Sequence, residues 1–176
     1  MVGSAPVRRM SSLLNMRNLS EAGDIVAHNP SKEKVWKAIA DCADLEQSGG
    51  QVRYFIRSSA GSADAFTKVN GDSIEEMYRY ARRYGLTTES NLARMRQGLA
   101  PVFKDGSVAH LDHIIPVKYA PELKTLPANL RILSSAENTS RKAAIDNACR
   151  HRVKILQGNI KWKPSPELSR ELNHSK

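Results

Sequence analysis

Two stretches of the chain decide its fold: residues 108–117, VAHLDHIIPV, and residues 129–142, NLRILSSAENTSRK. The first is a β-rich run that ends near Pro116, and the second opens with another short strand, NLRILSS. A proline-containing loop, YAPELKTLPA, joins them. Ser134 and Glu137 then form a capping-box pattern that opens a helix, which we expect to reach about Ile155. The order strand, loop, strand, helix predicts a ββα unit.

Polar residues in these two stretches form a set that suits the hydrolysis of a phosphodiester. That reaction needs a base for water, a cation for the developing charge, and positioning. His113 is largely neutral at physiological pH and can take the proton. Asp112 supplies a carboxylate and Asn138 an amide oxygen, and two oxygen ligands favour a hard ion. One divalent metal is therefore expected, Mg²⁺ first, Mn²⁺ next, with Zn²⁺ or Ni²⁺ less suited.

The same residues carry a family resemblance. Asp-His-Ile-Ile-Pro, Asn-Leu-Arg-Ile-Leu and Glu-Asn-Thr-Ser-Arg-Lys are similar to the HNH domains of RNA-guided CRISPR nucleases and of many phage and restriction enzymes. The resemblance covers Pro101 to Ile155 and implies a ββα-metal endonuclease. By it, His113 matches the general base, Asp112 and Asn138 match the metal ligands, and Asn129 matches the central asparagine of the catalytic set that braces the loop between the strands.

Neighbouring residues of a strand point to opposite faces, so Asp112 and His113 pose a geometric question. We expect both to lie where the strand bends into the loop, because Pro116 marks a nearby strand end. His110 lies two residues before Asp112 and could share its face. It is a candidate for an extra metal or phosphate contact.

Charge points to a polyanionic partner. The chain has a net charge of +9, and residues 131–176 carry ten Lys or Arg against four Asp or Glu. A basic surface of this kind favours phosphate contacts without base specificity. We expect DNA contacts from residues that follow the candidate site: Arg141, Lys142, Arg150, Arg152 and Lys154. A generic basic surface is the plainer interpretation of the same charges.

A second family resemblance suggests a biological role for the chain. The run Arg-Met-Arg-Gln-Gly-Leu-Ala-Pro-Val-Phe-Lys-Asp-Gly-Ser-Val-Ala-His-Leu-Asp-His is similar to the segment before the active-site histidines of HNH toxin domains in bacterial polymorphic toxins. The chain departs from them at Asp112 and Asn138, where many toxins carry histidine. The toxin resemblance implies an acidic immunity protein as a partner and delivery into a target bacterial cell, with the cytoplasm as the site of action.

The remaining sequence predicts an α+β fold with a mainly helical N-terminal part at 1–98, an HNH core at 99–160 and a basic, irregular tail at 161–176 with room for one short helix. Ser31 could cap a helix to Gln47, QVRYFIR is a candidate strand, and SSAGSADAFTKVNG is loop-like. Ser73 and Glu76 indicate a second helix start, Gly85 its end, and a further helix runs from Thr87 or Thr88 to Gln97. Asp105-Gly106 predicts a hairpin turn.

Other features exclude some classes of protein. Cys42 and Cys149 form no CxxC pair, which excludes a cysteine-rich zinc knuckle and favours two reduced, buried thiols, although a disulfide stays open. No apolar run is long enough to span a membrane, and the first residues lack the apolar core of a secretory signal. The sequence therefore predicts a DNA endonuclease of low sequence specificity, and it favours a bacterial toxin or effector nuclease over a phage or mobile-element nicking enzyme. A silent DNA-binding module and a basic interaction domain are the alternatives.

Overall fold

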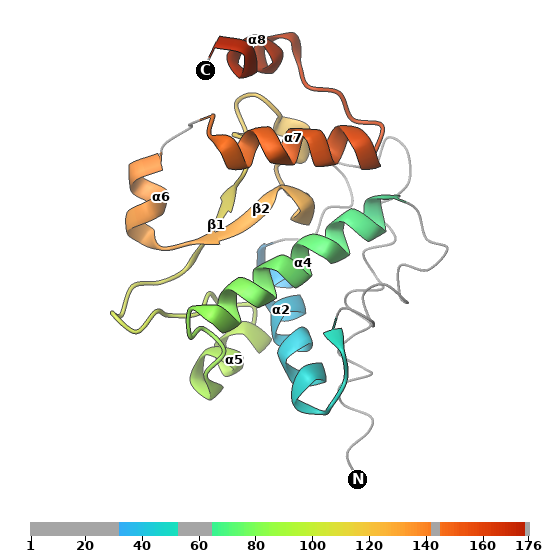
Figure 1. Cartoon of the computed structure of the whole chain (residues 1–176). Helices are drawn as coiled ribbons and strands as arrows, with labels where there is room; N and C mark the ends of the chain where they lie inside the picture. Colours follow the sequence, from blue (N-terminus) through green and yellow to red (C-terminus); the bar gives the residue numbers. More distant parts are fainter. Residues whose placement is uncertain (1–31, 53–64, 142–144, 175–176) are drawn as a thin grey trace.

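The computed structural model describes residues 32–52, 65–141 and 145–174, which form helices around a small antiparallel sheet (Figure 1). This mixed architecture agrees with the α+β class expected from the sequence. The elements follow the chain in this order: α2 (Lys32–Gln47), α4 (Ala65–Arg83), α5 (Glu89–Arg96), β1 (His110–His113), the 3₁₀ turns η2 (Pro121–Leu123) and η3 (Pro127–Asn129), β2 (Leu130–Leu133), α6 (Ser135–Arg141), α7 (Asn147–Asn159) and α8 (Pro166–His174).

The N-terminal helices end where the sequence indicates. α2 stops at Gln47, and Gly49 follows with a positive φ. α4 is followed by Gly85 and α5 by Gly98, both with φ values that only glycine adopts at low cost. Thr88 caps α5 by accepting a hydrogen bond from the Asn91 amide. The predicted ends of these three helices are therefore confirmed.

The start of α4 was predicted wrongly. The helix begins at Ala65, so part of the expected loop is helical, and Ser73 lies inside the helix instead of capping it. Ser73 is buried and accepts a hydrogen bond from Arg152 of α7. Upstream of it, Val69 and Asn70 are buried, and Asn70 accepts from the Ala128 amide in η3. These tertiary contacts hold the first turns, which local propensity did not predict. Most of the candidate strand QVRYFIR lies outside the described residues.

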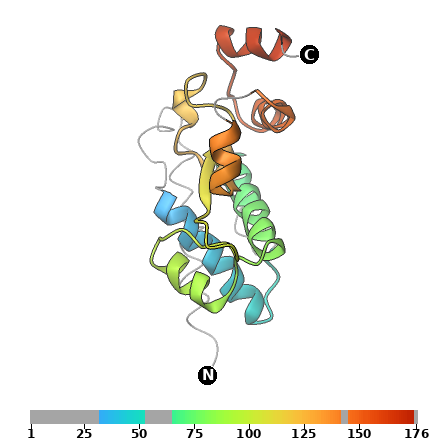
Figure 2. The ribbon, with the colours of Figure 1, turned by 90° about the vertical axis from the view of Figure 1, so that its left-hand side faces the viewer.

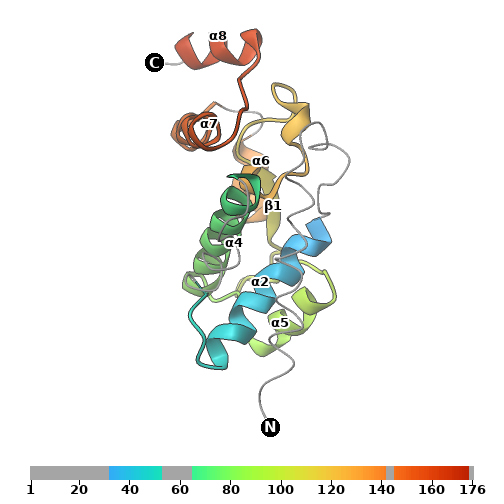
Figure 3. The same ribbon diagram turned by 90° about the vertical axis from the view of Figure 1, so that its right-hand side faces the viewer.

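α4 packs on α2 of the N-terminal part and on β2, η3 and α7 of the C-terminal part (Figures 1 and 3). One apolar core joins α2, α4 and α5 to both strands, with Ile39, Met95 and Ile132 among its buried members. The predicted boundary between 98 and 99 therefore runs through a continuous core. A second apolar cluster gathers the loop between the strands with α7 and α8, around residues such as Leu123 and Leu156.

The two strands pair antiparallel, from His110 opposite Leu133 to His113 opposite Leu130. Before β1, the Asp105-Gly106 turn is present, and Gly106 has a positive φ. Its flanks form only a single bridge between Val102 and Val108, so the predicted hairpin is a turn with minimal pairing.

The helix after β2 was predicted as one and is two. Its start is confirmed: the Ser134 amide donates to the Glu137 carboxylate at 2.9 Å, and the Glu137 amide donates to the Ser134 hydroxyl at 3.2 Å. α6 ends at Arg141, and α7 begins after Asp146, whose side chain accepts from the Cys149 amide at 2.8 Å. Asp146 is a good N-cap, and its extended backbone interrupts the helix.

The C-terminal tail contains the one short helix for which the sequence left room. Residues Pro166–His174 form α8, and the Ser165 hydroxyl accepts from the Leu168 amide at its start. Leu168 is fully buried against the second apolar cluster. In Figure 3, α8 lies above α7 at the end of the molecule away from α5. None of the helices in the described ranges is both long and apolar enough to cross a membrane.

Candidate functional site

Asp112 lies in the middle of the sheet and is engaged by an arginine. It is directly opposite Arg131 in the strand register, and the Arg131 Nε lies 3.2 Å from the Asp112 Oδ2. The Nη2 of the same guanidinium lies 3.4 Å from the Oδ2 of Asp146. Arg131 therefore bridges a carboxylate of β1 and the carboxylate that caps α7. The Asp112 side chain is only 16% exposed, so this pair is partly shielded from water.

His113 closes β1 and is held by the loop that follows. Its Nε2 lies 2.5 Å from the main-chain oxygen of Lys124, just after η2. A carbonyl oxygen can only accept, so Nε2 carries the hydrogen in this contact. In the neutral ring the other nitrogen, Nδ1, is then the one that has a lone pair for a proton.

The surroundings of His113 keep its ring neutral. Burial lowers the pKa of His113 below its ordinary value of 6.5, and the cations of Lys32 and Lys124 act in the same direction. The hydrogen bond to the Lys124 carbonyl and the charge of Asp112 act the other way and are outweighed. A half-buried, neutral imidazole at this position is therefore present at physiological pH.

The expected bend between Asp112 and His113 is absent. The register is unbroken from His110 to His113, and the chain leaves the strand only at Ile114. Because strand side chains alternate, Asp112 shares a face with His110, whereas His113 leaves from the other face. Their different partners, Arg131 on one side and the Lys124 carbonyl on the other, agree with this arrangement.

Asn129 joins the two ends of the loop between the strands. Its Oδ1 accepts from the Ile115 amide at 2.8 Å, and its Nδ2 donates to the Ile115 carbonyl at 3.0 Å. The Ile114 amide donates to the Asn129 carbonyl at 2.9 Å. Asn129 and Ile115 are both fully buried. Such contacts are those of a bracing residue, and they fix the backbone directly after His113.

His110 links β1 to α6 through a chain of hydrogen bonds. The Ser135 hydroxyl donates to the Val108 carbonyl at 3.0 Å and lies 3.0 Å from the His110 Nε2. Because its one hydrogen is used on the carbonyl, the hydroxyl accepts from Nε2–H, and the His110 Nδ1 accepts from the Asn138 Nδ2 at 3.3 Å. Both ring nitrogens of His110 are thus engaged. His110 thereby orients the Asn138 amide, and its role as an extra metal or phosphate contact stays a prediction.

This orientation bears on whether the site suits a metal. With Nδ2 turned to His110, the amide oxygen of Asn138 is the atom left to bind a cation, and His110 shares a strand face with Asp112. A carboxylate and an amide oxygen are the ligands that Mg²⁺ and Mn²⁺ prefer. Within the described ranges no three His, Cys, Asp or Glu side chains gather around one point, so water and phosphate oxygens would complete the shell. The donor chemistry fits one hard divalent ion.

The five basic residues predicted to contact DNA have different surroundings. Lys154 is exposed on α7. Arg150 donates to the Leu172 carbonyl of α8, so it anchors that helix. Arg152 is buried, and its guanidinium donates to Ser73 at 3.1 Å and to Glu76 at 2.9 Å. It ties α7 to α4, and the prediction of a DNA contact is withdrawn for this residue. The Arg141 side chain and Lys142 lie outside the described part.

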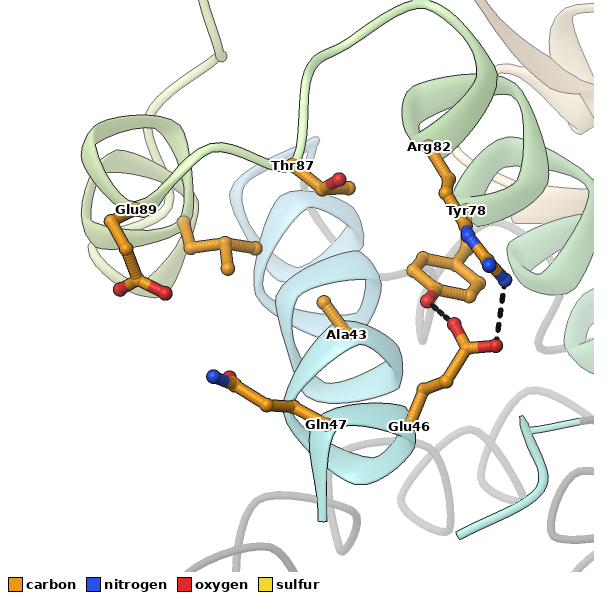
Figure 4. A pocket seen from close by; sticks show the side chains of 8 residues that line it. Ala43, Glu46, Gln47, Tyr78, Arg82, Thr87 and Glu89 are labelled. Carbon is orange, nitrogen blue, oxygen red and sulfur yellow. Dashed lines mark hydrogen bonds and ion pairs between the residues drawn. The ribbon is translucent and has the colours of Figure 1, made fainter. Parts of the chain in front are cut away.

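A polar pocket lies between α2, α4 and α5, and its lining includes none of the candidate site residues (Figure 4). Glu46 is its central group: it accepts from the Tyr78 hydroxyl and from Arg82 at 2.7 Å. Arg79 also pairs with Glu46, and Arg96 pairs with Asp44 of α2. These three arginines therefore each pair with a carboxylate of α2. Cys42 and Cys149 are both buried, free thiols, as expected.

Three partners of the site were missed from the sequence: Arg131, Asp146 and the Lys124 carbonyl. A register drawn from the two strands would have placed Arg131 beside Asp112. A helix break before Asn147 would have required recognising Asp146 as an N-cap. A main-chain oxygen has no sequence signal. Comparison of the chain with protein-family models, with curated proteins and with solved structures finds no match.

Proposed function

We propose that this chain is a metal-dependent endonuclease of the HNH type that hydrolyses phosphodiester bonds of DNA with low sequence preference. The observation that supports the proposal most is the state of His113. Its Nε2 is held by the Lys124 carbonyl, and its surroundings favour the neutral ring. A neutral histidine with one nitrogen fixed and the other open to accept a proton is what a general base requires.

The proposed roles follow from the contacts. Nδ1 of His113 takes a proton from the attacking water, while the Nε2–H···O bond holds the ring. Asn129 fixes the turn after His113 and so preserves its position. Asp112 and the Asn138 oxygen would hold one Mg²⁺ or Mn²⁺, which when bound offsets charge on the phosphate and on the departing oxygen. His110 orients Asn138 for that task.

Because Asp112 and His113 leave opposite faces of β1, the scissile phosphate must lie across the end of this strand. His113 is the last residue of β1, and the chain turns away at Ile114. A phosphate at that end can contact the imidazole from one side and a cation beside Asp112 from the other. Low sequence preference follows from contacts to the backbone rather than to base edges.

A silent DNA-binding module is the second candidate, and one observation favours it: Arg131 already pairs with the carboxylate that a metal would need. Cleavage of supercoiled plasmid by the wild type and by His113→Ala separates the two, in EDTA, Mg²⁺, Mn²⁺ or Zn²⁺. His151→Ala is the matched control, since His151 is an exposed histidine on α7. Cutting by the wild type and the control alone, with Mg²⁺ or Mn²⁺, supports the nuclease. DNA binding without cutting in any metal supports the module.

The biological setting stays a prediction. A toxin delivered into bacteria would be lethal when expressed in the bacterial cytoplasm, and co-expression of its acidic immunity protein would relieve that effect. A phage or mobile-element enzyme would need no such partner. Loss of toxicity in His113→Ala would tie any lethal effect to the proposed site.

A further inference from the structure

Arg131 stands between two carboxylates that come from distant parts of the fold. Asp112 lies on β1 and Asp146 at the start of α7, and the guanidinium reaches Oδ2 of each, at 3.2 and 3.4 Å. The Arg131 side chain is 22% exposed and the Asp112 side chain 16%. At this depth charges are less screened than on an open surface, so each group affects the others.

The guanidinium cannot relieve this arrangement by losing a proton. Arginine stays charged at any pH at which the protein is folded, so Arg131 always presents a positive charge to Asp112. A divalent cation that binds the Asp112 carboxylate meets that charge at close range. Either the cation is repelled, or the guanidinium moves. Asp146 offers it a second anionic partner already within reach, without any movement of the backbone.

We propose that Arg131 is a positioning residue that acts as the resident counter-ion of Asp112, competes with a divalent metal for that carboxylate, and shifts to Asp146 when the metal binds. The inference rests on the proposed function, because it takes Asp112 as a metal ligand. Arg131 holds Asp112 in place before loading and sets the concentration of metal at which the site fills. Asp146 therefore affects the metal affinity of a site to which it contributes no ligand.

The test is titration calorimetry with Mn²⁺ alone on the full chain, without DNA. Arg131→Gln removes the competing charge and should tighten Mn²⁺ binding roughly tenfold, the order expected for a nearby charge in a partly exposed site. Arg131→Lys retains the charge and should stay close to the wild type. Asp146→Asn removes the second acceptor and should weaken binding severalfold. Asparagine caps helices as well as aspartate does, so this variant keeps the start of α7.

Opposite signs for Arg131→Gln and Asp146→Asn are the decisive result, since a merely structural role would weaken binding in both. Thermal melting in EDTA is the second readout: Arg131→Gln should melt below the wild type, and saturating Mn²⁺ should close that gap. Unchanged or weaker Mn²⁺ binding by Arg131→Gln overturns the inference while leaving the proposed function intact. Equal Mn²⁺ binding by wild type and Asp112→Asn removes Asp112 as a ligand, and the inference falls with that part of the proposed function.

Discussion

Replacing Asn129 with alanine should destabilise the protein and slow cleavage together. Asn129 satisfies both main-chain groups of Ile115, at 2.8 and 3.0 Å, and both residues are fully buried. The variant leaves a buried amide and a buried carbonyl without partners, each at about 1–3 kcal/mol, so we expect a loss of about 3 kcal/mol after partial relaxation. For a chain of 176 residues this corresponds to a fall in Tm of roughly 6–12 °C.

The fold supplies a matched control for this variant. Asn91 of α5 makes the same pair of bonds to Val102: its Oδ1 accepts from the amide at 2.8 Å, and its Nδ2 donates to the carbonyl at 2.9 Å. Val102 is partly exposed, so water can replace some of what Asn91→Ala removes. We expect about 1–2 kcal/mol for this variant. The hydrogen bonds of Asn91 go to Thr88 and Val102, outside the candidate site, so its loss should leave the cleavage rate unchanged.

Urea unfolding followed by circular dichroism gives the two stabilities, and single-turnover cleavage at 25 °C gives the rates of the folded proteins. Asn129→Ala should cut at least about tenfold more slowly, because a shift of the backbone after His113 misplaces the base. A stability within about 1 kcal/mol of the wild type would mean that the Asn129 bonds are replaced by water, against their burial. An unchanged rate despite a large loss of stability would show that the brace does not position His113.

The other predictions concern the base, the helix tie and the DNA contact. The value of kcat/KM should fall at acid pH as His113 takes a proton, but at pH 6.5 it should still exceed half of its plateau. The reason is that the pKa of His113 lies below its ordinary value, and any cation beside Asp112 would lower that pKa further. A midpoint of the pH profile above 6.5 would exclude His113 in this environment as the general base. Arg152→Met should leave DNA affinity unchanged and lower the free energy of unfolding by about 1–3 kcal/mol, since it removes the bonds to Ser73 and Glu76; urea melts and a binding titration test both. Lys154→Ala should weaken DNA binding evenly across sequences and reduce the salt slope by about one, and an unchanged slope would place α7 away from the DNA.

The parts of the fold that could be predicted are those that local sequence patterns determine. Glycines with positive φ end α4 and α5, and the reciprocal bonds of Ser134 and Glu137 start α6 where the sequence indicated. The errors arose where a long-range contact overrode a local signal. Ser73 reads as a helix cap, yet Arg152, which lies far along the chain, holds it inside α4.

The candidate site likewise combines residues that the sequence identifies with surroundings that it does not predict. The sequence names Asp112, His113, Asn129 and Asn138, and the fold brings Asn138 to β1 through His110. Burial is what the sequence could not supply: of the basic residues on α7, Arg152 is inside and Lys154 is outside, although both look alike in a charged run. Charge counts therefore predict a polyanionic partner but not which cations reach it.

The regular register of β1 has a consequence for how the site would work. Asp112 and His113 are adjacent, yet one is held by Arg131 across the sheet and the other by a carbonyl of the loop. Their relative position thus depends on the sheet and the loop remaining fixed to each other at Ile115, where Asn129 bonds both main-chain groups. Loss of that connection would let the base drift from the carboxylate without changing either residue. The brace is therefore as important to the proposed chemistry as the two groups that it aligns.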